Sequence, residues 1–440
     1  MRALVTGVRD KAAKTPAGRE RHVDLLRAAA ICVVVIGHWL AIAVVYDDGE
    51  LGGVNALHVL TWAHPLTWVV QVMPIFFLVG GFANGASLSS HLESGGDSVS
   101  WLHSRTDRLL RPVTVLFLVV PAVAIVAVLA GVPEDLVGTA TWLTSIPLWF
   151  LLAYLAMVVL APWMYALHRR AGLAVPLVLV AWVAVADLLR IGFEVPVVGE
   201  STFLVGWLAV HQLGFCWRDG RVPAGGLPAM VWTLAALAVL LALTVAGPYG
   251  IRMVGVNTDP PTLALMALAA TQAGVVFLLR PSGSRWLQRL RPWTVVVGLN
   301  AVVLTLFVWH MTAAVIAAVA LFPTGVLPQP EVDSGAWLLW RIPWVAACAL
   351  VLAVLVAMFA PIELRTVDAE QARAGVVRDV LTALGVVAVL GGLLGVALAG
   401  RDYHGWGGLP PLAVLSYLGG AAVLRVVRSG WLQRNSRMPG

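Results

Sequence analysis

The amino-acid sequence predicts an all-α protein, a polytopic transmembrane helical bundle. Three observations support this fold class. Hydrophobic residues make up 60% of the 440 residues and charged residues only 12%, and the mean hydropathy is +0.88. The apolar residues occur in blocks of about 20, the length of helix that crosses a bilayer. Basic residues gather between alternate blocks. A soluble domain of this composition could not cover its own core, so soluble fold classes are excluded.

Ten apolar blocks form the predicted core, and two more follow at the C-terminal end. Clusters of Gly, Pro and charged residues bound each block and mark the ends of helices. The core blocks are 25–45, 65–88, 112–130, 144–166, 173–189, 202–216, 227–246, 262–279, 294–321 and 337–360, and the additional blocks are 380–399 and 409–427. We therefore expect a basic cytoplasmic tail at 1–23, a ten-helix membrane domain at 24–363, and two additional helices with a basic cytoplasmic tail at 364–440.

The placement of charge follows the positive-inside rule, by which basic residues stay in the cytoplasm. The N-terminal tail and alternate later connections are basic: Arg2, Arg9, Lys11, Lys14, Arg19, Arg21, then Arg105, Arg108, Arg111, Arg169, Arg170, Arg218, Arg221, Arg280, Arg285, Arg289, Arg291, Arg365, Arg373, Arg378, Arg425, Arg428, Arg434 and Arg437. The opposite connections are acidic: Asp47, Asp48, Glu50, Glu134, Asp135, Glu331 and Asp333, with Arg190, Arg252, Arg341 and Arg401 on or near that side. This pattern predicts a multi-pass protein of the cell inner (plasma) membrane with both termini in the cytoplasm.

The same charge pattern argues against a nucleic-acid partner. Lys and Arg exceed Asp and Glu by 29 to 23 and the sequence pI is about 9.6, but this excess is dispersed by membrane topology.

The three cysteines, Cys32, Cys216 and Cys348, lie apart in apolar blocks, so we expect neither a disulfide framework nor a metal site. No phosphate-binding loop or nucleophile elbow is present.

Three polar residues stand out in the first apolar block. Asp24, Arg27 and His38 lie in a segment that is otherwise almost wholly apolar. Eleven residues at about 100° each bring Arg27 and His38 onto one helix face, about 16 Å apart along the axis. Asp24 lies within one turn of Arg27 and can pair with it. A histidine at this depth either hydrogen-bonds a neighbouring helix or acts as a general base.

Several motifs resemble the membrane-bound acyltransferase type 3 family. They are the pair Arg27 and His38, MPIFFLVGGF at 73–82, RTDRLLRP at 105–112, PLWFLLAYL at 147–155 and LFVWHM at 306–311. The resemblance implies that the chain moves an acyl group from cytoplasmic acyl-CoA to an extracytoplasmic or lipid-linked acceptor. One departure is Gly80, where the family commonly has a serine before Gly-Phe, which leaves close helix packing as the expected use of this position.

The resemblance also implies where substrates bind. Arg105 and Arg108 correspond to the family's cytoplasmic arginine motif, and with Arg111 they would bind the phosphates of coenzyme A; the alternative is ordinary topology charge. His310 resembles the family's aromatic-histidine element, and with Asn300 and Trp149 it is a candidate for substrate binding. The alternative for these three is a structural role between helices.

The predicted function is therefore an integral membrane O-acyltransferase. An acetyl or other short acyl group would pass from acyl-CoA, as donor substrate and not a bound cofactor, to a hydroxyl of an envelope carbohydrate, a glycolipid or a small metabolite. The predicted catalytic residues are His38, Arg27 and Asp24. His38 would be the base, and Arg27 would orient the donor or pair with Asp24. Membrane lipids would surround the bundle. A transiently acylated histidine is an alternative route. A proton-coupled transporter or flippase, and a non-catalytic scaffold, are alternative classes.

Overall fold

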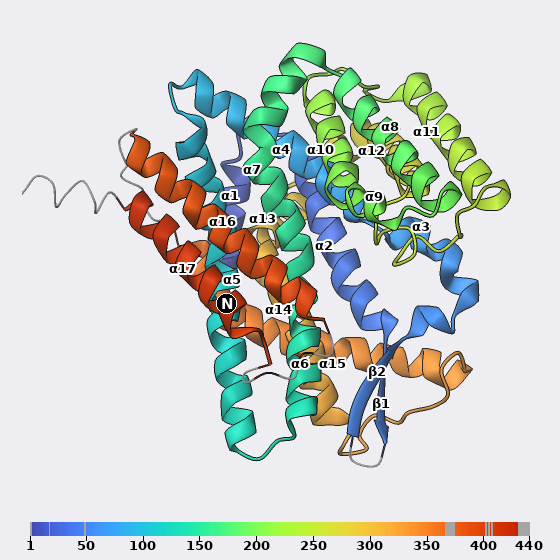
Figure 1. Cartoon of the computed structure of the whole chain (residues 1–440), viewed down its shortest axis with the longest axis vertical. Coiled ribbons are helices and arrows are strands. Elements are labelled where there is room, and N and C mark those ends of the chain that lie inside the picture. Colours follow the sequence, from blue (N-terminus) through green and yellow to red (C-terminus); the bar gives the residue numbers. More distant parts are fainter. Residues whose placement is uncertain are drawn as a thin grey trace, which may run out of the picture. The chain divides into compact units, whose positions relative to one another are not determined.

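The computed structural model describes residues 2–16, 18–47, 50–365, 375–400, 403, 405 and 408–429 (Figure 1). Asp48, Arg373, Arg401, Arg434 and Arg437 of the predicted charge pattern lie outside these residues. The chain forms two compact units. Unit 1 comprises Met1–Val34, Leu60–Ser90 and Leu160–Ala301, and unit 2 comprises Val35–Val59, His91–Val159 and Val302–Gly440.

Unit 1 is built from helices of the N-terminal and central parts of the chain. These are α1 (Arg2–Ala13), the first part of α2 (Arg21–Ala41), η2 (Thr61–Leu66), α3 (Thr67–Val70), most of α4 (Met73–Glu93), the second part of α7 (Leu148–Ala171), α8 (Ala174–Asp187), η3 (Leu188–Gly192), α9 (Pro196–Glu200), α10 (Thr202–Arg218), α11 (Gly226–Leu241), η4 (Ala242–Ala246), α12 (Leu263–Trp286) and α13 (Leu290–Ala301).

Unit 2 contains the remaining helices and a β-hairpin. Its elements are the end of α2, β1 (Ile42–Asp47), β2 (Glu50–Asn55), η1 (Ala56–His58), the end of α4, α5 (Ser98–Leu129), α6 (Glu134–Ser145), the start of α7, α14 (Val303–Leu321), α15 (Gly335–Leu364), α16 (Val376–Ala399) and α17 (Pro411–Arg428). In Figure 1, α16 and α17 lie side by side, and they form an extensive helix pair.

The predicted all-α, polytopic fold is confirmed. In the described part of the chain, 11 helices or helix pairs are long and apolar enough to cross a membrane. The sequence predicted twelve spans. The difference is α10, which has 17 residues and is therefore shorter than the roughly 20 that cross a bilayer. Its side chains are largely buried inside unit 1.

The first predicted span, 25–45, is too long. Helix α2 ends at Ala41, and β1 follows and pairs antiparallel with β2, with Ile42 opposite Asn55 and Asp47 opposite Glu50. Val44, Val45 and Tyr46 are β-branched or aromatic, which favours a strand over the last turn of a helix. Hydropathy alone does not distinguish an apolar strand from a helix end.

The ninth predicted span, 294–321, is also wrong as a single helix. It divides into α13 and α14 at Val302, whose backbone leaves the helical region (φ −123°, ψ 21°). No proline or glycine marks this break in the sequence. The cause is a carboxylate from a distant helix, described below.

The N-terminal tail contains a packed helix. Ala12 of α1 is buried with Trp293 and Val296 of α13 in one apolar cluster of unit 1. The Trp293 indole donates to the Thr15 hydroxyl (2.9 Å), and the Arg21 guanidinium stacks on the same ring. The tail is therefore basic on its exposed side and apolar where it meets α13.

Candidate active site

Two histidines that are far apart in the sequence meet in unit 2. His38 lies near the end of α2, and His310 lies in the middle of α14. His38 Nδ1 and His310 Nε2 are 2.8 Å apart, and the rings stack with centroids 5.0 Å apart at 25°. His310 has no exposed surface, whereas His38 is partly exposed. Only His38 of this pair can therefore meet a substrate.

The contacts of His310 assign the protons on both rings. A backbone carbonyl can only accept, so His310 Nδ1, 2.6 Å from the Phe307 oxygen, carries a hydrogen. The other nitrogen of a neutral imidazole is then an acceptor, and His310 Nε2 accepts from His38 Nδ1. The lone pair of His38 consequently lies on Nε2. This is the protonation that a general base requires.

The end of α2 is held in place by side chains of α15. The last carbonyls of a helix have no partner within the helix and need one elsewhere. The Trp344 indole donates to the Trp39 carbonyl (2.8 Å), and Arg341 donates to the Ile42 carbonyl (2.7 Å). The Trp39 indole in turn donates to the His310 carbonyl (2.9 Å). These bonds fix the orientation of His38 relative to His310.

Glu363 of α15 explains why α14 begins at Val303. Its carboxylate accepts from the backbone N–H groups of Leu304 (3.2 Å) and Thr305 (2.8 Å) and from the Thr305 hydroxyl (2.6 Å). A carboxylate at a helix N-terminus satisfies unpaired N–H groups and is favoured by the helix dipole. Arg108 interacts electrostatically with the same carboxylate. Sequence reasoning missed Glu363, whose only local signal was an acidic residue at the end of an apolar block.

Trp149 belongs to an aromatic group that reaches His310. The Trp149 and Phe150 rings meet edge to face at 6.3 Å, Phe150 meets Phe307 at 5.1 Å, and Phe307 lies 5.8 Å from the His310 ring. Trp149 is partly exposed and Phe150 is buried. The predicted substrate-binding residues Trp149 and His310 are therefore connected in unit 2 through aromatic contacts.

Asp24 and Arg27 form an ion pair at the start of α2, in unit 1. Arg27 Nη1 lies 3.6 Å from Asp24 Oδ1, as the one-turn spacing predicted. Arg19 is the closer partner, with Nε 2.6 Å from Oδ2 and Nη2 3.1 Å from Oδ1. The hydrogen bond with Asp24 raises the pKa of Arg19. Asn300 donates to the backbone carbonyls of Asp24 (2.8 Å) and Val296 (2.9 Å), which joins α13 to α2.

The three predicted donor-binding arginines lie along α5 in different surroundings. Arg105 stacks over Trp101 at 5.8 Å, and Arg108 is exposed and near Glu363. Arg111 pairs with Asp107 and donates to the Arg365 carbonyl. Arg108 is thus the member of the set that is linked electrostatically to the start of α14.

Comparison with known protein families identifies the functional class of this protein. A model of the acyltransferase 3 family, described as an acyltransferase domain, matches residues 21–360. The chain belongs to the acyltransferase 3 family. It is therefore a membrane acyltransferase, and the matched region begins with α2 and ends within α15. Beyond that region, the described part of the acyltransferase contains two further helices, α16 and α17. Comparison with curated proteins and with solved structures gave no match.

Other buried polar groups of the acyltransferase serve packing in unit 1. His168 Nε2 lies 3.0 Å from Asp219 Oδ2, and its Nδ1 lies 3.8 Å from the Cys216 thiol. This order of thiol, imidazole and carboxylate resembles a nucleophilic triad, but Cys216 and His168 have no exposed surface, so no substrate can meet the thiol. Among the described residues, no group of three or more His, Cys, Asp and Glu side chains could hold a metal ion.

Proposed function

We propose that this membrane acyltransferase moves an acetyl or other short acyl group from cytoplasmic acyl-CoA to a hydroxyl of an envelope carbohydrate, a glycolipid or a small metabolite. His38 is the general base. Its Nε2 accepts the hydroxyl proton while the acceptor oxygen attacks the thioester carbonyl and the coenzyme A thiolate leaves. The proton then passes from His38 to that thiolate. The observation that supports this role most directly is the hydrogen-bonded series His38, His310 and Phe307 carbonyl.

His310 is a positioning residue in this proposal. It accepts from His38 Nδ1 and thereby holds the basic lone pair on Nε2, the nitrogen on the opposite side of the ring. The bond persists when His38 becomes an imidazolium, because Nδ1 remains a donor. Orientation of a base by a second group is a common feature of nucleophilic and acid–base catalysis.

The donor and acceptor sides are proposed from the remaining predicted residues. Arg105, Arg108 and Arg111 would bind the phosphates of the donor, since guanidinium groups bind phosphate oxygens in pairs. Arg27 and Asp24 would position the donor rather than touch the reacting carbonyl. Trp149 would stack on a sugar ring or an apolar acceptor. Asn300, which donates to the Asp24 carbonyl, would hold the start of α2, where Arg27 would position the donor.

The test is comparative mass spectrometry of lipids and glycans from cells with and without the protein. We expect one acyl increment to be missing when the protein is absent, and missing again with His38→Ala. Loss of a general base lowers a rate by about 10² to 10⁴-fold. The matched control is His58→Ala, which removes an exposed histidine on η1 and should leave the increment intact.

The outcome that contradicts the proposal is a His38→Ala protein that inserts normally and still acylates its acceptor. A labelled acyl-CoA added in a single turnover separates the two chemical routes. Direct transfer leaves the wild-type protein unlabelled, whereas the covalent route leaves an acyl group on His38 that disappears in His38→Ala.

A further inference from the structure

A cavity of about 790 Å³ lies in unit 2 against α17, a helix that follows the family domain. Its walls come from α5, the end of α15 and α17. Residues of α17 supply one side of it, and α17 lies beyond the matched residues 21–360. The cavity is therefore not a feature of the matched acyltransferase domain alone, and its use is a separate question from the role of His38.

One end of the cavity is basic. Four arginines line it, Arg111 on α5, Arg365 after α15, and Arg425 and Arg428 in the last turn of α17. They face one lining carboxylate, that of Asp107, which pairs with both Arg111 and Arg428. Asp107 thus orients two guanidinium groups without neutralising the set. Such a cluster matches a phosphate group, which several guanidinium groups can bind at once.

The other end of the cavity is apolar and extends along the helices. Leu118 lies seven residues beyond Arg111 on α5, and Leu418 lies seven residues before Arg425 on α17. At 1.5 Å per residue each distance is about 10 Å. A ligand that fills both ends must have an anionic head and an apolar chain of at least this length.

The cavity walls are fixed to one another. The Phe117 and Tyr417 rings stack at 4.0 Å, and the Tyr417 hydroxyl donates to the Leu110 carbonyl (3.2 Å). His103, which also lines the cavity, bonds the Thr382 hydroxyl of α16 (2.8 Å). These contacts join α5 to α17 and to α16 around the cavity.

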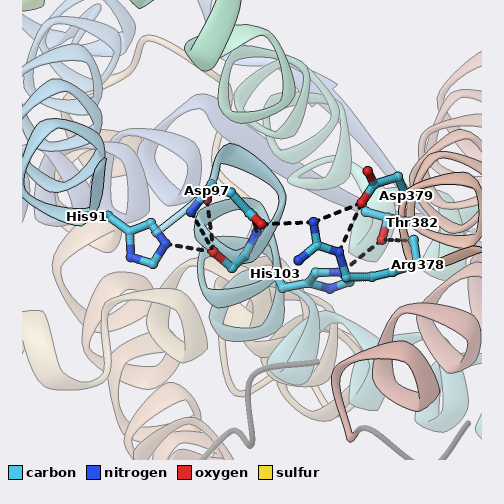
Figure 2. Close-up of polar contacts among 7 residues, drawn as sticks. His91, Asp97, His103, Arg378, Asp379 and Thr382 are labelled. Atoms are coloured by element: carbon cyan, nitrogen blue, oxygen red, sulfur yellow. Dashed lines mark hydrogen bonds and ion pairs between the residues drawn. The ribbon is translucent and has the colours of Figure 1, made fainter. Parts of the chain in front are cut away.

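A polar network secures the same helices at the basic end (Figure 2). Asp97 caps the start of α5 by accepting from the Ser100 N–H (2.7 Å), and it also accepts from Arg378 of α16 (2.9 Å). His91 completes the network through the Ser100 hydroxyl (2.7 Å). Burial opposes the charge of Asp97, but the bonds from Ser100 and Arg378 outweigh it and lower the pKa of this carboxyl below its ordinary value.

We propose that this cavity binds an anionic phospholipid, with the headgroup phosphate among Arg365, Arg425 and Arg428 and one acyl chain along Leu118 and Leu418. Both long walls are helices that can span a membrane. Leu118 lines the cavity and is 55% exposed, so a chain can enter there from the bilayer. Basic pockets between transmembrane helices are typical sites for anionic headgroups. The lipid joins the α16–α17 pair to the acyltransferase domain.

Native mass spectrometry of the purified full-length protein tests the proposal, with palmitoyl-oleoyl phosphatidylglycerol as the probe and the phosphatidylcholine of the same chains as reference. We expect preferential binding of phosphatidylglycerol. The variant Arg425→Gln/Arg428→Gln should bind it about 10- to 30-fold more weakly. The matched control is Arg169→Gln/Arg170→Gln, which removes two exposed arginines from the last turn of α7 and should bind as wild type.

A second variant keeps the test independent of the charged end. Leu118→Trp fills the apolar end from an exposed position, and we expect it to reduce phosphatidylglycerol binding while the protein remains folded. The proposal is overturned if both variants bind like the control, or if phosphatidylcholine binds equally well. It is also overturned if glycerol phosphate displaces the lipid, which indicates a soluble phosphate ligand, or if palmitoyl-CoA binds more tightly, which assigns the cavity to the donor.

Discussion

At the scale of single residues, His38 and His310 have separate roles because their exposures differ. His38 is partly exposed and keeps a free lone pair, whereas His310 is fully buried and has both ring nitrogens engaged, one with Phe307 and one with His38. The spacing of Arg27 and His38 in the first apolar block identified His38 as a candidate catalytic residue. The second was predicted as a substrate-binding residue, whereas its burial and its hydrogen bonds support a positioning role.

The role of His310 can be separated from simple packing. We expect His310→Leu to lower kcat for acyl transfer by about 10- to 100-fold with little change in KM for acyl-CoA, because His38 would lose the partner that holds its tautomer. His310→Gln, whose amide oxygen can still accept from His38 Nδ1, should recover part of the activity. Steady-state kinetics with the acceptor identified by mass spectrometry provide the measurement.

The control for this prediction is His211→Leu. His211 is equally buried and bonds Asn84 within unit 1 (3.1 Å), so its loss disturbs packing without touching His38. If His211→Leu and His310→Leu reduce kcat equally, a positioning role for His310 is wrong.

At the scale of elements, residues distant in sequence set where helices begin and how closely they pack. Glu363 of α15 caps α14, so the break after α13 depends on a side chain 58 residues away.

Glycines determine how closely α16 and α17 pack against each other. A Cβ on Gly420 would lie 2.6 Å from the Gly385 carbonyl oxygen and 2.8 Å from the Val389 nitrogen, so only glycine fits this crossing.

Two adjacent glycines of α17 provide a matched test. Gly420→Ala should push α17 away from α16 and lower the stability of the protein by about 1 to 3 kcal/mol, the usual cost of overpacking. Gly419→Ala should have little effect, because a Cβ there meets no atom within 4 Å. The midpoint of thermal unfolding in detergent measures both. Equal midpoints for the two variants would show that the close approach does not stabilise the helix pair.

At the scale of the whole molecule, charge placement predicts the orientation in the membrane. The structure also shows why some arginines depart from the pattern. Arg341 donates to the Ile42 carbonyl and stacks on Trp337 at 4.4 Å, and Arg190 pairs with Asp187 at 2.9 Å. Because these two arginines have partners within the protein, their position does not contradict the positive-inside rule, which concerns basic residues of the connecting loops.

The predicted orientation can be measured by cysteine labelling. In a Cys32→Ser background, which leaves only the buried Cys216 and Cys348, we expect Glu331→Cys to react with a membrane-impermeant maleimide in intact cells. Arg289→Cys should react only after permeabilisation. Both positions are exposed. The reverse labelling pattern would place the termini outside the cytoplasm.

The sequence by itself determined the features that depend on local composition and spacing. Blocks of about 20 apolar residues predicted the helical membrane fold, and an ionisable side chain within the first block marked His38 as a candidate base. The matched family domain agrees with the motifs that predicted the family. The end of α2 at Ala41 and the break at Val302 were not predicted, because hydropathy does not distinguish an apolar strand from a helix or reveal a distant cap.

Only the tertiary structure decided the pairings. His310 lies 272 residues after His38 in the sequence. The walls of the cavity come from α5 and α17, and Thr114 of α5 contacts Tyr417 of α17, which lies more than 300 residues later in the chain. Helical periodicity and hydropathy describe each segment separately, whereas a hydrogen bond needs two atoms brought within about 3 Å by the packing of separate segments. The protonation of His38, the capping by Glu363 and the basic cavity all depend on that packing.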